Sequence, residues 1–163
     1  EVWATSGPLV LEGTEARSAA SVAEGLAEVV ASVDAPEYIA INAFIDMSAD
    51  ARASVERFRQ ALARRTRAAT TVGFGPRFLH STGQLHKGGP AHGLFIQLWD
   101  EPKQDIEIPE RSYGFKTMVR AQELGDHQAL ARRGRKILRV GLGSDPLGAL
   151  AQLTQELTGL REV

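Results

Sequence analysis

Residues 77–87 hold side chains whose types and spacing could act together on one small ligand. If this segment forms a helix, each residue turns by about 100°, so His80, Gln84 and Lys87 share one face. That face would bring an imidazole, an amide and an ammonium group to one point. Such a set can move a proton, hydrogen-bond a hydroxyl group and attract an anion.

The elements around this segment would place it at the end of a strand. A strand-like run, residues 69–74, precedes it, and a second apolar run, residues 94–99, follows the helix stop at 88–90. In α/β proteins, anionic ligands bind where a helix begins after a strand. Phe78 and Leu85 would lie on the opposite stripe and face the core. Polar residues on one helix face are usually just solvated, so spacing alone leaves both interpretations open.

The histidines do not have the spacing of a metal site. His80, His86 and His92 are six residues apart, and six residues turn by about 600° on a helix, so neighbours point apart. No carboxylate stands among them at helical ligand spacing, and we expect no metal ion. Residues 83–88 superficially resemble a phosphate-binding loop, but the lysine precedes the glycines, so we expect no nucleotide and no other cofactor.

Composition narrows the functional class further. The chain has 163 residues, 43% hydrophobic and 24% charged, which is typical of one globular domain. A formal net charge of −1 gives no attraction to nucleic acid or to acidic membranes. There is no cysteine, no apolar run long enough to cross a bilayer and no visible signal peptide. We therefore expect a cytoplasmic protein with neither a nucleic-acid nor a membrane partner.

Hydrophobic patterns predict four strands, at residues 38–44, 69–74, 94–99 and 136–141, and a short strand around 9–11. They also predict five further helices, over residues 14–32 (opened by Thr14, Arg17 and Ser18), 49–67 (capped by Ser48), 115–124, 128–133 and 146–160. Gly125 and Asp126 are expected to separate the two helices on either side of them. This alternation predicts a single α/β domain over residues 1–163, a three-layer sandwich around a mainly parallel sheet of four or five strands.

Residues 75–90, GPRFLHSTGQLHKGGP, resemble a segment of the fused transaldolase/glucose-6-phosphate isomerase proteins. The part from Leu79 to Gln84 is similar to the Leu-His-Ser-x-Gly-Gln segment of bacterial glucose-6-phosphate isomerases. Residues 121–126, AQELGD, and residues 108–118 give weaker matches downstream. In the second of these, Lys116 stands where the family usually has a glycine. The resemblance runs from about Pro8 to the end of the chain.

The resemblance implies a SIS-type (sugar isomerase) domain and the interconversion of glucose 6-phosphate and fructose 6-phosphate. It assigns to His80 the opening of the sugar ring, for which an imidazole suits because its unperturbed pKa is about 6.5. Gln84 would orient His80 or hydrogen-bond sugar hydroxyls. Lys87 would attract the anionic substrate or support the enediolate. Ser81 and Thr82 complete the expected substrate-binding residues.

Three parts of the family's active site have no match in this sequence: the glutamate base, the serine/threonine phosphate loop and the late catalytic lysine. The resemblance therefore implies a piece of a longer chain, inactive alone, whose site is completed by other domains or by the second subunit of a homodimer. Two alternatives stay open. The chain could be a non-catalytic phosphosugar-binding or dimerisation module, or a structural appendage of a transaldolase.

Overall fold

The computed structural model describes residues 1–13 and 18–160 of the chain. Its centre is one six-stranded sheet with the strand order β1-β2-β6-β5-β3-β4. The strands are β1 (Val2–Ser6), β2 (Leu9–Gly13), β3 (Tyr38–Phe44), β4 (Ala69–Phe74), β5 (Gly93–Trp99) and β6 (Lys136–Gly141). The four strands β6, β5, β3 and β4 are parallel and coincide with the four predicted strands.

The sheet is mixed, with six strands, so the prediction of a mainly parallel sheet of four or five strands needs correction. The first residues form a hairpin of β1 and β2, and β2 pairs antiparallel with β6. The turn of this hairpin contains Gly7, whose positive φ of 59° suits a residue without a Cβ atom. A two-residue connection joins antiparallel neighbours directly. Because β2 also pairs antiparallel with β6, it runs against the four parallel strands.

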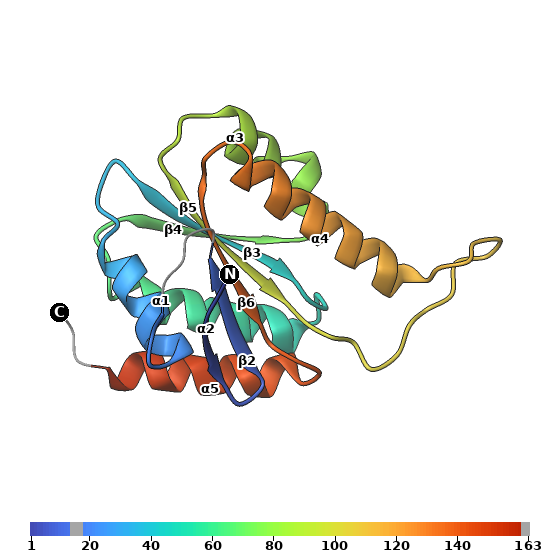
Figure 1. The fold of residues 1–163 in the computed structure, drawn as a ribbon, viewed down its shortest axis with the longest axis horizontal. Helices are drawn as coiled ribbons and strands as arrows, with labels where there is room; N and C mark the ends of the chain where they lie inside the picture. Colours follow the sequence, from blue (N-terminus) through green and yellow to red (C-terminus); the bar gives the residue numbers. More distant parts are fainter. Residues whose placement is uncertain (14–17, 161–163) are drawn as a thin grey trace.

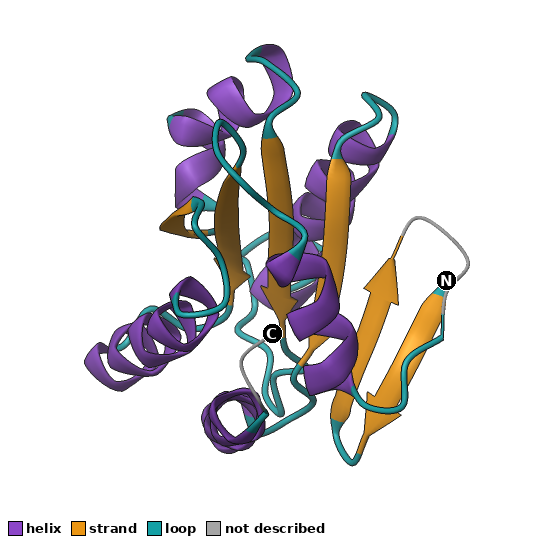
Figure 2. Cartoon of the chain, turned by 90° about the vertical axis from the view of Figure 1, so that its left-hand side faces the viewer, coloured by secondary structure: helices purple, strands orange, loops and turns teal. Residues whose placement is uncertain are grey.

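Helices cover both faces of the sheet and give the predicted three-layer α/β sandwich (Figure 1). On one face lie α1 (Val22–Ala31), α2 (Ala49–Ala63) and α5 (Pro146–Gly159), and on the other lie α3 (Thr82–Gly88) and α4 (Phe115–Ala131). Figure 2 shows the sheet between these two layers. A short 3-10 turn, η1 (Arg77–His80), connects β4 to α3.

Side-chain caps fix three helix starts. Ser21, Ser48 and Asp145 accept hydrogen bonds from the backbone of the first turns of α1, α2 and α5, as expected for Ser48. The helix predicted over 14–32 begins only at Val22, and its predicted opening residues Thr14 and Arg17 lie outside the described part of the chain. The helix predicted to reach residue 67 ends at Ala63.

Gly125 and Asp126 do not separate two helices, contrary to the sequence prediction. Both lie inside α4, which runs without a break from Phe115 to Ala131. Gly125 is exposed, and Asp126 is buried where it accepts a hydrogen bond from Gln97 of β5 at 2.9 Å. The tertiary contacts of Asp126 thus keep residues 125 and 126 helical, although glycine and aspartate have weak intrinsic helix propensity.

The two faces of the sheet differ in polarity. The face under α1, α2 and α5 carries the main hydrophobic core. The opposite face holds a smaller cluster around Phe95 and Ile137. Beside this cluster four polar residues of adjacent strands stand in register, namely Asn42, Gln97, Arg139 and Glu12. This polar row faces α4, whose acidic residues Glu123 and Asp126 find partners there.

Candidate functional site

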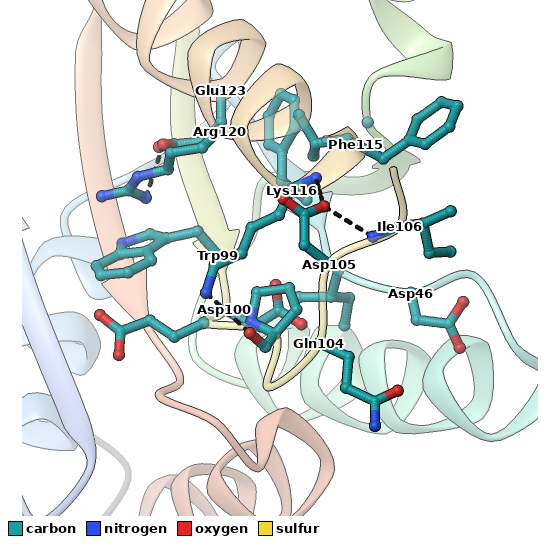
Figure 3. A pocket seen from close by; sticks show the side chains of 16 residues that line it. Asp46, Trp99, Asp100, Gln104, Asp105, Ile106, Phe115, Lys116, Arg120 and Glu123 are labelled. Atoms are coloured by element: carbon teal, nitrogen blue, oxygen red, sulfur yellow. Dashed lines mark hydrogen bonds and ion pairs between the residues drawn. The ribbon is translucent and has the colours of Figure 1, made fainter. Parts of the chain in front are cut away.

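A cavity of ≈ 710 Å³ opens at the carboxyl ends of β3 and β5, next to the first turns of α4 (Figure 3). Ligands of open α/β sheets bind at this edge, because the loops that leave the strands there surround a crevice. Residues of three segments line the cavity: Phe44, Ile45 and Asp46 after β3; Trp99, Asp100, Glu101, Pro102, Gln104, Asp105 and Ile106 after β5; and Phe115, Lys116, Val119, Arg120 and Glu123 of α4, with Gly75 beyond β4.

The loop after β5 is held against the start of α4. The Oδ1 atom of Asp105 accepts hydrogen bonds from the backbone N–H groups of Ile106 and Lys116, each at 2.8 Å. The N–H of Phe115 donates to the carbonyl of Ile106 at 2.9 Å. A Cβ atom on Gly114 would come within 2.4 Å of the Asp105 carboxylate. Gly114 thus allows the loop to approach the helix closely enough to form one wall of the cavity.

Two carboxylates stand where β3 and β5 end. Phe44 and Trp99 are paired in register, so Asp46 and Asp100 follow on neighbouring strands. Burial raises the pKa of Asp100 to about 6, and the charge of Asp46 also raises it, against the opposing effects of a backbone hydrogen bond and of Lys116. The Lys116 ammonium group donates to the Pro102 carbonyl at 2.9 Å.

A chain of ion pairs supports the opposite wall. The guanidinium carbon of Arg120 lies 3.9 Å from the centroid of the Trp99 ring, a cation–π contact. Arg120 also pairs with the buried carboxylate of Glu123 at 2.9 Å. Glu123 in turn pairs with Arg139 of β6 at 2.9 Å, and Arg139 contacts Glu12 of β2. These contacts fix Trp99 and Arg120, so that this side of the cavity is formed in advance of binding.

The predicted site residues form a different surface. Residues 77–87 are not one helix, because Ser81 has φ −140° and ψ −104° between η1 and α3. His80, Ser81, Thr82 and Gln84 are all exposed. In the described part of the chain, the His80 side chain has no hydrogen-bond or ion-pair partner, while Gln84 makes only a long contact of 3.5 Å to the Leu79 carbonyl.

The predicted core face of this segment is half wrong. Phe78 is buried, as expected, but Leu85 is 59% exposed. The irregular backbone at Ser81 shifts the phase of α3, and His86 is buried in place of Leu85. The His86 ring lies among the rings of Tyr38, Phe78 and Phe95, and burial lowers its pKa.

Lys87 does not share the exposed surface of His80 and Gln84. Its ammonium group lies 2.5 Å from the Oδ1 atom of Asp126, with 22% of the Lys87 side chain and 1% of the Asp126 side chain exposed. The pair ties α3 to α4. His80, Ser81, Thr82 and Gln84 are thus exposed and close together in the chain, whereas Lys87 lies in a contact between two helices.

Sequence reasoning missed the cavity, and none of the predicted site residues lines it. Gly75, the first residue of the segment that resembles the isomerases, does line the cavity. One signal was present in the sequence. Asp100 follows an apolar strand directly, and the carboxyl ends of parallel strands are the usual place for ligands.

No family model matches the sequence, and a search of curated proteins finds no match either. Among solved structures, a hypothetical protein from Thermus thermophilus is similar in fold, with a TM-score of 0.69 and 20% identity. The match covers 85% of this chain and 38% of that protein, so the chain spans well under half of its structural neighbour. At this identity the likeness shows a shared α/β fold.

Two further observations hold for the described residues. None of the helices there combines the length and the apolar character needed to cross a membrane. Within the same residues, no group of three or more histidine, cysteine or carboxylate side chains is arranged so that it could hold a metal ion.

Proposed function

We propose that the chain is the part of a glucose-6-phosphate isomerase that supplies the ring-opening histidine, His80, from a SIS-type domain. The observation that carries this proposal is the state of His80 within the segment 75–90. In that segment, which resembles the isomerases, the imidazole is exposed, and the described residues offer it no partner. A histidine that is part of a core or an ion-pair network would be engaged, as His86 is engaged by its aromatic neighbours.

The chemistry asked of His80 is a proton transfer. Ring opening of glucose 6-phosphate moves a proton from the anomeric hydroxyl to the ring oxygen. Near neutral pH an imidazole can accept a proton from the hydroxyl group and donate a proton to the ring oxygen. Gln84 lies in α3 and is also exposed. Its amide is available to hydrogen-bond sugar hydroxyls, and Ser81 and Thr82 offer hydroxyl groups on the same surface.

The exposure of His80 also supports a composite site. Isomerisation needs a base that moves a proton between C1 and C2 and a cation or donor that stabilises the enediolate. Within the described residues no carboxylate contacts His80, and Lys87 is paired with Asp126. We infer that the base, the phosphate loop and the enediolate-stabilising group come from other domains of a longer chain or from a second subunit of a homodimer. Fusion to a transaldolase and a place in glycolysis and gluconeogenesis belong to the same proposal.

A titration with fructose 6-phosphate tests substrate binding. In two-dimensional NMR spectra of the protein, we expect shifts of His80, Ser81, Thr82 and Gln84 to saturate with ligand. The His80→Gln variant should weaken them. The His92→Gln variant, which changes another exposed histidine of the same connection between β4 and β5, should bind as the wild type does. Shifts confined to regions remote from residues 75–90 would count against the proposal.

A further inference from the structure

We propose that the cavity at the carboxyl ends of β3 and β5 binds a small organic cation, an ammonium or guanidinium group carried on an apolar body. This site is separate from the proposed isomerase function, because the isomerase substrate is an anion and His80 does not line the cavity. Three observations support it: the charge of the lining, the free carboxylates at the strand ends and the aromatic walls.

The lining is acidic. Its charged residues are five acids and two bases, a formal charge of 2 − 5 = −3: Asp46, Asp100, Glu101, Asp105 and Glu123 against Lys116 and Arg120. Both cations are engaged within the protein. Arg120 pairs with Glu123 and stacks on Trp99, and Lys116 donates to the Pro102 carbonyl. An anion that entered the cavity would meet net repulsion and cations that already have partners.

The carboxylates at the ends of β3 and β5 remain available. Among the described residues, neither Asp46 nor Asp100 forms an ion pair, although Asp46 accepts a weak hydrogen bond from the backbone of Ser48 at 3.3 Å. The burial of Asp100 and the repulsion between the two carboxylates both oppose the charge of Asp100. A ligand cation between the two would offset this repulsion, so the free protein holds a destabilised charge that a cation would stabilise.

The rest of the wall suits an apolar body. Phe44, Trp99 and Phe115 come from three different segments that line the cavity. Figure 3 shows Trp99 and Phe115 among the lining side chains. Phe115 and Ile106 are 44% and 70% exposed, unusually high for large apolar side chains, and both would lose contact with water when a ligand binds. Aromatic faces also attract cations, and because Arg120 already stacks on Trp99, the exposed Phe115 is the ring that could contact the ligand cation. A volume of ≈ 710 Å³ lies in the ordinary range of small-molecule sites.

Three probes that differ in charge test the proposal: phenethylammonium, its neutral analogue 2-phenylethanol and the anion 3-phenylpropionate. Binding is measured by NMR titration of the wild-type protein at pH 7.5. We expect the cation to bind about tenfold more tightly than either other probe, since a charge contact in a partly desolvated site contributes that much. The shifts should map to the residues of the cavity. Equal binding of the neutral probe, preferred binding of the anion, or shifts elsewhere would overturn the proposal.

Variants identify the carboxylates. Asp100→Asn and Asp46→Asn should each weaken the cation at least severalfold and leave 2-phenylethanol unchanged. Asp50→Asn, an exposed aspartate in the first turn of α2 outside the cavity, should leave all probes unchanged. If Asp100→Asn does not give the wild-type pattern of NMR peaks, Asp46→Asn carries the test alone. If every variant that folds, whether Asp100→Asn or Asp46→Asn, bound the cation as tightly as the wild type does, the assignment would be overturned.

The pH dependence gives an independent readout. Cation binding needs Asp100 ionised, and the pKa of Asp100 in the free protein is about 6. The charges of Asp46 and of Lys116 in α4 act on it, and Glu101 and Asp105 line the same cavity. Affinity for the cation should therefore fall between pH 7.5 and pH 5 in the wild type and change much less in Asp100→Asn. A fall of the same size in both proteins would contradict the role of Asp100.

Discussion

Asp126 is the residue on which the polar contacts between α3, α4 and the sheet converge. Its carboxylate pairs with Lys87 at 2.5 Å and accepts from Gln97 at 2.9 Å. We expect Asp126→Ala to lower the free energy of unfolding by about 2–4 kcal/mol, because it leaves a buried amide and a mostly buried ammonium group without a partner. Urea denaturation measures the change. The control Gln128→Ala, exposed on the same helix, should stay within about 0.5 kcal/mol of the wild type.

His86 should make stability depend on pH. Burial lowers its pKa in the folded state, with smaller effects from Asp126, which raises it, and Lys87, which lowers it. In the unfolded state His86 therefore binds more protons below about pH 6.5, and the contribution of His86 to the free energy of unfolding should fall as pH drops through that value towards the lower folded pKa. Asp100 acts in the opposite direction, because its raised pKa makes the folded state bind more protons. His86→Phe should reduce this slope between pH 7 and pH 5. His127, whose pKa is also lowered by burial, should maintain part of it.

Denaturation at several pH values measures the slope. His92→Gln, at an exposed position, should reproduce the wild-type slope. An unchanged slope in His86→Phe would show that His86 does not titrate in this range.

Residue-level prediction from the sequence succeeded where one local rule decides and failed where packing decides. Ser48 is a cap because its hydroxyl reaches the backbone three residues on. Leu85 was predicted to be buried, but His86 is buried instead. The irregular backbone at Ser81 resets the helical phase, and the periodicity of the sequence does not reveal it. The partner of Lys87 lies 39 residues further on, in α4, and only the tertiary structure shows it.

At the scale of elements, long patterns were the most informative. Strands β3 and β5 are nearly continuous apolar runs buried on both faces, which is the signature of a parallel strand between two helical layers. The hairpin β1–β2 was mostly missed, because its strands are short and β1 is an edge strand that is only partly buried. Edge strands are specified by pairing more than by hydrophobicity.

The continuity of α4 through Gly125 makes a prediction about stability. A Cβ atom at Gly125 would meet nothing within 4 Å, and the residue has helical backbone. Gly125→Ala should therefore raise the free energy of unfolding by about 0.5–1 kcal/mol, as expected for glycine in a helix interior. Thermal or urea denaturation gives the value.

Gly134 provides the matched control. A Cβ atom there would also meet nothing within 4 Å, but the residue has φ +64°. Gly134→Ala should lower the free energy of unfolding by about 1–2 kcal/mol, because left-handed backbone is unfavourable with a side chain. If both variants changed stability in the same direction, backbone conformation would not be the cause.

For the molecule as a whole, the two candidate surfaces have different characters. The cavity after β3 and β5 is acidic and walled by three segments, whereas the surface of His80 and Gln84 is open and, among the described residues, has no acid in contact with the imidazole. An open surface with one proton-transfer group suits a site that a second domain or subunit completes. The ion pair between Lys87 and Asp126 joins α3 to α4 and so holds the helix that carries Gln84 in place.

We propose that His80 opens the sugar ring, and the most direct test compares two substrates in the intact protein. With glucose 6-phosphate, His80→Ala should lower kcat/KM by about 10²–10⁴-fold, the usual contribution of a placed proton-transfer group. With a shorter aldose phosphate that cannot cyclise, the same variant should keep near-wild-type activity. Gln84→Ala should lose less, because a neutral hydrogen bond contributes only about 0.5–1.5 kcal/mol. Near-normal turnover of glucose 6-phosphate by His80→Ala would contradict the account.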